Sequence, residues 1–262
     1  EQGADLIIAV DPDADRCALA VPDPASETGW TPLSGDQIGS LLGEFLASRG
    51  MKGSLANSIV SSRLLSRIAS AHGLEHHTTL TGFKWIARAP GLGFGYEEAI
   101  GFCPDPAHVR DKDGIATSVV AASLVAALKA QGRSVWDELE RLARLHGLHV
   151  SSPLTFRVEE IEQIASGMAR LRAQPPSVLA GSPVVEVSDL SQGYRGLPPT
   201  DGVLVLTEAG DRVIARPSGT EPKLKCYLEV ILPVAEGEPL PWDQAHERLD
   251  AIKGAFAEII GL

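Results

Sequence analysis

Short apolar runs alternate with amphipathic segments through the first half of the chain. Runs at 6–10 and 17–21 are rich in branched residues and predict two buried strands. Apolar residues then recur at helical spacing after Ser34, and further strands are expected at 54–61, 76–79 and 94–96, with helices at 63–72, 115–130 and 134–146. The helix at 115–130 is so rich in Ala, Val and Leu that we expect it to be buried. This alternation predicts a layered α/β domain with a mixed sheet.

The 134–146 segment is amphipathic and predicts a helix that packs against the core. Its apolar face is expected to hold Val135, Trp136, Leu139, Leu142 and Leu145.

The rhythm changes near residue 148. A strand is expected at 150–158, broken by Pro153, and a helix at 159–172. Strand-like segments then follow one another at 184–187, 203–207, 212–215 and 224–232, before a closing helix at 242–260. Strands grouped between two helices predict a smaller α+β domain with an antiparallel sheet. The fold class is therefore α/β, with a layered mixed-sheet domain followed by this smaller one.

Composition narrows the class of protein. The chain has 262 residues, of which 44% are hydrophobic and 22% charged, which suits two globular domains. A formal net charge of −11 argues against nucleic acid or an acidic membrane surface as a partner. No apolar run is long enough to cross a membrane, and the three scattered cysteines favour a reducing, cytoplasmic setting. Because the chain begins without Met in the approach to a strand, we expect it to be part of a longer protein.

The connection between the first two strands carries three alternating carboxylates, Asp11, Asp13 and Asp15, followed by Arg16. Carboxylates so close together repel one another unless a cation lies among them, and a hard divalent ion with oxygen ligands fits. An EF-hand is excluded, because it needs Gly at the sixth loop position and Glu at the twelfth, where this chain has Arg16 and Pro22. A phosphatase loop of the haloacid-dehalogenase type is disfavoured, because it also needs a later acidic pair after a strand, and the sequence offers no convincing one. A polar turn capped by aspartates stays open as the plain alternative.

Further candidates lie between residues 81 and 114. Lys84 is expected in the first turn of a helix, where it could reach an anionic ligand or simply be solvated. Glu97 and Glu98 follow a short strand, and such carboxylates suit the hydroxyls of a sugar, although an exposed acidic turn is the alternative. A dense charge cluster, 110–113, precedes the 115–130 helix and includes Arg110 and Lys112. Such a cluster is costly unless it is paired or exposed in a cleft.

The loop at 216–223 offers a set of donors for an oxyanion, and phosphate binding outweighs a plain turn there. Its members are Arg216, Ser218, Gly219, Thr220 and Lys223.

Taken together, these loops resemble those of the α-D-phosphohexomutase family, which includes phosphoglucomutases, phosphomannomutases and phosphopentomutases. Three stretches match in the family's order: 11–16 the metal loop, 97–101 the sugar-specificity loop and 216–220 the phosphate loop. Residues 110–114 and 81–84 fit as well. The resemblance implies that 1–30 ends the family's second domain, that 31–147 is its sugar-recognition domain and that 148–262 is its phosphate-binding domain.

Roles follow from the resemblance position by position. Asp11, Asp13 and Asp15 would hold Mg²⁺, Arg16 would lie beside the reacting phosphoryl group, and Lys112 would assist proton transfer near the sugar. The remaining substrate contacts would be Lys84, Glu97, Arg110, Arg216, Ser218, Gly219, Thr220 and Lys223. Ala99 replaces a serine of many relatives, and the form Tyr-Glu-Glu-Ala-Ile-Gly favours the branch with phosphopentomutases and glucose-1,6-bisphosphate synthases.

The family's nucleophile, a phosphoserine on a Ser-His loop, has no counterpart here, since no serine is followed by histidine. The expected function is therefore the C-terminal part of a phosphosugar mutase, inactive alone and completed by an N-terminal domain. The expected partner is a hexose 1- or 6-phosphate or the bisphosphate intermediate. An Asp11-nucleophile phosphatase and a non-catalytic phosphosugar-binding module are the alternatives.

Overall fold

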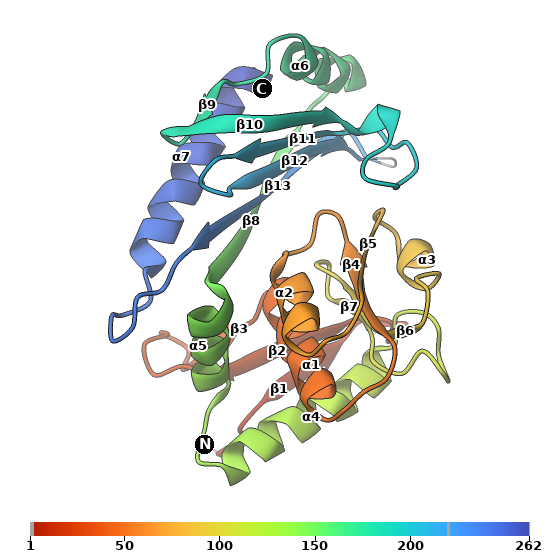
Figure 1. The fold of residues 1–262 in the computed structure, drawn as a ribbon, viewed down its shortest axis with the longest axis vertical. Coiled ribbons are helices and arrows are strands. Elements are labelled where there is room, and N and C mark those ends of the chain that lie inside the picture. The colour runs from red at the N-terminus through yellow and green to blue at the C-terminus, as the bar shows by residue number, and fades with distance from the viewer. Residues whose placement is uncertain (1–2, 219–220, 262) are drawn as a thin grey trace. The chain divides into compact units, whose positions relative to one another are not determined.

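Two sheets build the first compact unit, Glu1–His146, in the computed structural model, which describes residues 3–218 and 221–261 (Figure 1). The first sheet is antiparallel, in the order β1 (Ile7–Val10), β2 (Cys17–Pro22) and β3 (Trp30–Pro32). The second has the order β5-β4-β6-β7 and is mixed, because β4 pairs in parallel with β5 and β6 while β7 is antiparallel. Its strands are β4 (Ser54–Ser58), β5 (His76–Thr79), β6 (Leu92–Glu97) and β7 (Gly101–Cys103).

Helices cover both faces of the mixed sheet. Neighbouring residues of β4 show this, because Leu55 joins a large core with α1 and α2, whereas Ala56 joins a small core with Phe83 and Ile86 of α3. The helices of this unit are α1 (Gly35–Ser48), α2 (Leu64–Ala71), α3 (Phe83–Ile86), α4 (Gly114–Ala130) and α5 (Val135–His146). This arrangement confirms the predicted layered α/β domain.

Helix α1 lies unusually close to its neighbours because three glycines, one turn apart, face them. A Cβ on Gly35 would lie 2.0 Å from the Glu98 carbonyl oxygen, and one on Gly39 would lie 2.5 Å from the Tyr96 ring. A Cβ on Gly43 would likewise meet Leu65 at 2.5 Å. The helix therefore packs through its backbone, which larger residues would prevent.

The second unit, Gly147–Leu262, holds one antiparallel sheet in the order β8-β13-β12-β11-β10-β9. Its strands are β8 (Leu148–Arg157), β9 (Val178–Leu179), β10 (Ser182–Asp189), β11 (Val203–Thr207), β12 (Arg212–Pro217) and β13 (Lys223–Leu232). Helices α6 (Ile161–Ala173) and α7 (Trp242–Ile260) contact each other and β13, so they share a face of the sheet. The predicted α+β domain with an antiparallel sheet is confirmed.

Pro153 does not break the strand that contains it, contrary to the prediction. It lies inside β8, where it pairs with Tyr227. Strand β8 forms an edge of the sheet, a position in which a proline can direct its missing N–H away from the neighbouring strand.

Two predicted core faces are also only partly correct. Helix α4 buries Thr117, Ala121, Leu124 and Leu128, but Ile115 and Val119 on its other side are 66% and 64% exposed. In α5, Leu145 is 62% exposed, although Leu142 is fully buried. Apolar composition alone did not reveal which side of each helix has a neighbour.

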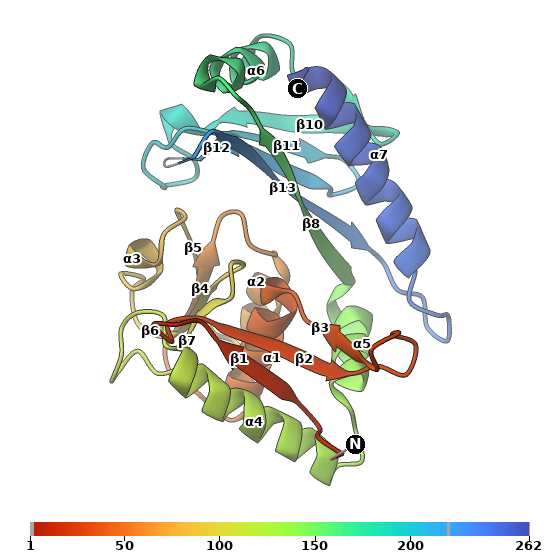
Figure 2. The ribbon, with the colours of Figure 1, turned by 180° about the vertical axis from the view of Figure 1, so that it is seen from behind.

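Strand β1 is exposed along its whole length, unlike β2, and forms an edge of its sheet. Figure 2 shows β1 with α4 running alongside it, and the two elements are in contact. Ile8 and Val10, which pair with the buried Leu19 and Cys17, are exposed apolar side chains of β1, and Ile115 and Val119 are those of α4; we call these four the β1/α4 face.

Among the described residues, no single helix combines the length and apolarity needed to cross a membrane. Helices α4 and α5 meet that test only as a pair, with a bend of 89° between them.

Candidate active site

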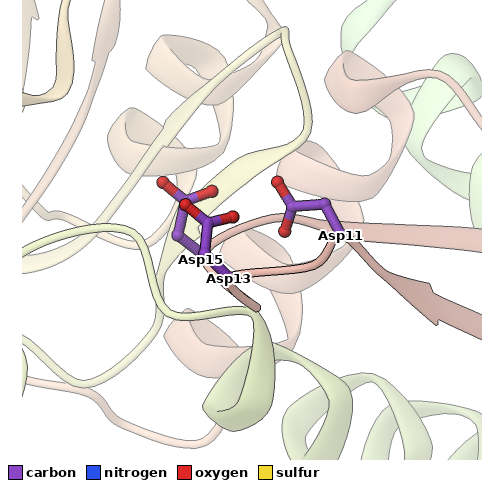
Figure 3. A group of neighbouring side chains, drawn as sticks. All are labelled: Asp11, Asp13 and Asp15. Atoms are coloured by element: carbon purple, nitrogen blue, oxygen red, sulfur yellow. The ribbon is translucent and has the colours of Figure 1, made fainter.

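The loop between β1 and β2 gathers three carboxylates on one turn. Asp11, Asp13 and Asp15 each offer an oxygen, and these three atoms lie within 4.8 Å of one another (Figure 3). The turn closes where the Ala14 N–H donates to the Asp11 carbonyl at 2.9 Å, with Ala14 in the left-handed region at φ 55°. This all-oxygen set fits a hard divalent cation such as Mg²⁺.

The carboxylate of Asp11 is held in its charged form by the backbone. The Arg16 N–H donates to Asp11 Oδ1 at 3.0 Å, and this bond is the main cause that lowers the pKa of Asp11 below 3.8. An ionised oxygen is the form that a metal requires.

Two cationic side chains flank the carboxylates. Lys112 Nζ lies 2.8 Å from Asp15 Oδ2, and Arg16 Nε lies 3.7 Å from Asp15 and 4.0 Å from Asp11. Burial pulls the pKa of Lys112 down, but the hydrogen bond and the charge of Asp15 outweigh it and raise that pKa above 10.5. Lys112 is therefore an ammonium group at neutral pH.

The N-terminus of α4 packs directly against the backbone of the carboxylate loop. The Gly114 N–H donates to the Ala14 carbonyl at 3.0 Å, and Asp113 caps the helix by accepting from the Ala116 N–H at 2.8 Å. A Cβ on Gly114 would lie 2.5 Å from the Arg16 carbonyl oxygen and 2.7 Å from that of Ala14. Only glycine fits there while the loop keeps this position.

The 97–101 loop joins the carboxylate loop directly. Arg16 Nη1 donates to the Ala99 carbonyl at 3.3 Å, and the Cys17 N–H donates to the Ile100 carbonyl at 3.1 Å. On its other side, Glu97 Oε1 accepts the Gly82 N–H at 2.6 Å, at the start of α3. The structure thus brings together two loops separated by more than eighty positions in the sequence.

The other two candidates of this region lie on or near α3. Lys84 is exposed in the first turn of the helix, and its Nζ lies 5.9 Å from the Trp85 ring centroid. Arg110 donates through Nε to the Ala87 carbonyl at 2.7 Å and through Nη2 to the Ala89 carbonyl at 3.4 Å. Arg110 thus ties the end of α3 in place, and its contact with substrate stays a prediction.

Glu98, which the sequence analysis grouped with Glu97 as a carboxylate suited to sugar hydroxyls, is half-buried and accepts hydrogen bonds from Ser58 and Ser61. Burial is the main cause that raises the pKa of Glu98 above 4.5. The two serines end β4 and begin the turn before α2, a region predicted only as strand. Nothing in the local sequence points from these serines to a glutamate some forty residues later.

The predicted phosphate loop lies in the second unit, between β12 and β13. The Ser218 N–H donates to the Lys223 carbonyl at 2.8 Å, and Lys223 Nζ pairs with Glu221 at 2.6 Å. Gly219 and Thr220, both predicted contacts, lie outside the described residues.

Neighbouring strands add cations beside this loop. In the register of the sheet, Arg157 of β8 lies opposite Lys223 of β13, and Lys225 of β13 lies opposite Arg216 of β12. Paired residues in antiparallel strands share a face, so these four form one cationic group. The sequence signal for Lys225 was its two-residue spacing from Lys223, whereas Arg157 could not be placed without the register.

Comparison with known proteins decides the family. Residues 34–145 match phosphoglucomutase/phosphomannomutase alpha/beta/alpha domain III, and residues 156–240 match the C-terminal domain of the same family. The chain belongs to this family. The carboxylate loop precedes both matched segments.

Curated relatives of this phosphohexomutase family member carry several names. The "Probable phosphomannomutase" of Haemophilus influenzae is 43% identical over 231 residues, which cover 87% of this chain and 47% of that protein. The phosphopentomutase of Mus musculus is 30% identical, over 97% of this chain and 46% of that protein. The phosphoglucomutase of Staphylococcus aureus strain MRSA252 is 33% identical, over 88% of this chain and 45% of that protein. The chain spans about half the length of the curated relatives it matches.

Solved structures support the same fold. The open form of parafusin, a phosphoglucomutase from Paramecium, matches with a TM-score of 0.70 at 19% identity, covering 97% of this chain and 46% of that one. A phosphoglucomutase/phosphomannomutase family protein from Burkholderia thailandensis matches with a TM-score of 0.65 at 17% identity, covering 98% and 47%. At these identities the likeness concerns the fold alone.

Proposed function

We propose that this phosphohexomutase chain carries the metal, sugar and phosphate sites of a phosphosugar mutase, which moves a phosphoryl group between C1 and C6 of a hexose. The observation that supports this most is the direct hydrogen bonding of the three-carboxylate loop to the 97–101 loop. A cation site beside a sugar-binding loop is what phosphoryl transfer to a sugar hydroxyl requires.

In this proposal Asp11, Asp13 and Asp15 hold Mg²⁺, which when bound neutralises charge on the phosphoryl oxygens. Arg16 orients that group, and Glu97 accepts a hydrogen bond from a sugar hydroxyl. Lys112, charged because of Asp15, donates a proton or a hydrogen bond to the sugar oxygen at which the P–O bond breaks.

Arg216, Ser218 and Lys223, together with Gly219 and Thr220, bind the phosphate that is not being transferred. Lys84 and Arg110 complete the proposed substrate contacts.

The phosphoryl donor is a phosphoserine in the part of the family's length that this chain does not span. The phosphoserine P–O bond breaks as the sugar hydroxyl oxygen bonds to phosphorus, and the hydroxyl proton passes to the serine oxygen, which gives a bisphosphorylated sugar. After the sugar reorients, the serine hydroxyl oxygen takes the other phosphoryl group, and a proton goes to the sugar oxygen that is released. The β1/α4 face is where we propose that this N-terminal region packs, because it is apolar and adjoins the carboxylate loop. Residues 1–262 alone would then bind phosphosugars without turnover.

The proposed compartment is a reducing cytoplasm, because Cys17, Cys103 and Cys226 are all buried free thiols.

Calorimetric titration of residues 1–262 with glucose 6-phosphate tests the binding part of this proposal. Arg216→Gln is expected to weaken binding at least tenfold, since a charge-assisted hydrogen bond contributes about 1.5–3 kcal/mol. Arg195→Gln, an exposed arginine of the same unit paired with Glu186, is the matched control and should leave binding unchanged. Robust mutase turnover by residues 1–262 alone would contradict the proposed division of labour.

A phosphopentomutase or glucose-1,6-bisphosphate synthase is the second candidate. Ala99 favours it, because it is exposed in the sugar loop and offers no hydroxyl to a hexose, and the mouse phosphopentomutase is among the relatives. A coupled assay against hexose and pentose phosphates, with the proposed N-terminal region present, separates the two.

A further inference from the structure

Glu98 occupies the middle of a loop in which successive residues are held by different elements. Glu97 before it is tied to the start of α3 through the Gly82 N–H, and Ala99 and Ile100 after it are tied to Arg16 and Cys17. The hydrogen bonds described for Glu98 go to neither of these elements but to Ser58 and Ser61. Its side chain reaches back to the turn that follows β4.

The contacts of Glu98 form a compact clasp, which we define as Ser58, Ser61 and Glu98. Ser58 Oγ and Ser61 Oγ both donate to Glu98 Oε2, at 3.1 Å and 3.0 Å. The Glu98 N–H donates in turn to Ser61 Oγ at 3.2 Å, and the two serine oxygens lie 2.8 Å apart. Both serines are 1% exposed, so this polar group has little access to water and is stabilised by its internal partners.

The backbone of Glu98 is fixed as tightly as its side chain. Its carbonyl oxygen lies against Gly35, where a Cβ would come within 2.0 Å. Ile100, two residues on, holds a left-handed conformation at φ 57°, which a branched residue adopts only when its surroundings impose it. The loop is thus held in one conformation by contacts on three sides.

We propose that Glu98 is a positioning residue, which through Ser58 and Ser61 fixes the 97–101 loop so that Glu97 presents an oxygen to a sugar hydroxyl. The inference rests on the proposed function, because it assigns Glu97 to the sugar. It goes beyond that function by naming the residues that determine the aim of Glu97. The Glu97 carboxylate has little rotational freedom, because its Oε1 already accepts the Gly82 N–H. A small rotation of the loop would therefore misplace Glu97 Oε2.

The experiment compares two ligands on residues 1–262, glucose 6-phosphate and inorganic phosphate, by calorimetric titration. In Glu98→Ala, affinity for glucose 6-phosphate is expected to fall about tenfold while affinity for inorganic phosphate is unchanged, because only the sugar contact depends on the loop. Glu98→Gln keeps an acceptor oxygen for the serines and should retain the wild-type affinity. The Ser58→Ala/Ser61→Ala double variant should reproduce the loss. Glu75→Ala, which removes an exposed carboxylate from the same unit, is the matched control and should change neither affinity.

Hydrogen exchange gives a second measurement that does not depend on ligand. In Glu98→Ala the amides of Gly82 and Cys17, which bond to Glu97 and Ile100, should exchange faster, while those of β4 and β5 should not change. Global unfolding of the variant would be seen as faster exchange everywhere. The affinities of the Glu98→Gln and double-serine variants for glucose 6-phosphate would then decide whether Glu98 positions the loop.

The outcomes separate this inference from the proposed function. Equal losses for both ligands in Glu98→Ala, or wild-type sugar affinity in that variant, would overturn the positioning role and leave the proposed function standing. A wild-type chain that binds inorganic phosphate but gains nothing from the sugar would overturn both.

Discussion

Replacing Gly114 by alanine should damage the carboxylate loop without touching a carboxylate. The added Cβ would lie 2.5 Å from the Arg16 carbonyl oxygen and 2.7 Å from that of Ala14, whereas ordinary contact begins at 3.4 Å. Both neighbours are backbone atoms, so the loop has to withdraw by about 0.7–0.9 Å. Overpacking of this size costs roughly 1–3 kcal/mol, against about 1 kcal/mol that alanine gains over glycine in a helix.

The same substitution at Gly254 is the matched control. Gly254 lies inside α7, where an added Cβ meets nothing within 4 Å. Gly254→Ala should therefore stabilise its helix by about 0.5–1 kcal/mol, in the opposite direction to Gly114→Ala. Urea denaturation measures the free energy of unfolding of both variants, and titration with Mg²⁺ measures the affinity of the carboxylate loop for the ion.

We expect Gly114→Ala to lower the unfolding free energy of the first unit by up to about 2 kcal/mol and to weaken Mg²⁺ binding, because the three oxygens lose their common position. Wild-type Mg²⁺ affinity in a fully folded Gly114→Ala protein would refute the claim that α4 supports the loop.

Three further changes test separate parts of the molecule. Asp13→Asn should weaken Mg²⁺ binding about tenfold or more yet leave the melting temperature unchanged or higher, because it removes one of three mutually repelling carboxylates; a calorimetric titration and a thermal melt report the two effects. Glu138 is buried, which on its own raises its pKa, but the hydrogen bonds and charges of Arg141 and Arg133 outweigh burial and lower that pKa below 4.5. Its stabilising contribution is thus present above pH 4.5 and lost as pH falls through the folded-state pKa, so Glu138→Gln should cost about 3 kcal/mol at pH 7 and progressively less in acid, as urea melts across pH will show. Ile115→Lys should leave residues 1–262 stable but impair their association with the proposed N-terminal region in a pull-down, whereas Ile161→Lys, at a side chain 63% exposed on α6, should not; equal binding by both would rule out the β1/α4 face as the docking site.

Features encoded over a few neighbouring residues could be predicted from the sequence. The carboxylate loop is such a case, because Asp11, Asp13 and Asp15 alternate on one turn directly after an apolar run. Ser34 likewise marked the start of α1, where it exchanges hydrogen bonds with Gln37 in a capping box.

Features that depend on distant partners could not be predicted. The burial of Glu98 depends on serines 37 and 40 positions away, and the tolerance of Pro153 depends on which strand of the sheet forms the edge. Leu145 fits the apolar face of its helix by spacing alone, but the structure leaves it exposed. Periodicity gives the side of a helix that can be buried, whereas the presence of a neighbour decides whether it is.

The close approach of α1 through Gly35, Gly39 and Gly43 has a mechanical consequence. A helix that touches its neighbours through main-chain atoms has no flexible side chains between the two surfaces to absorb a displacement. Movement of α1 would therefore be transmitted almost rigidly to Glu98 and Tyr96, at the base of the loop that carries Glu97. A strain applied at the far end of this helix would be felt at the 97–101 loop.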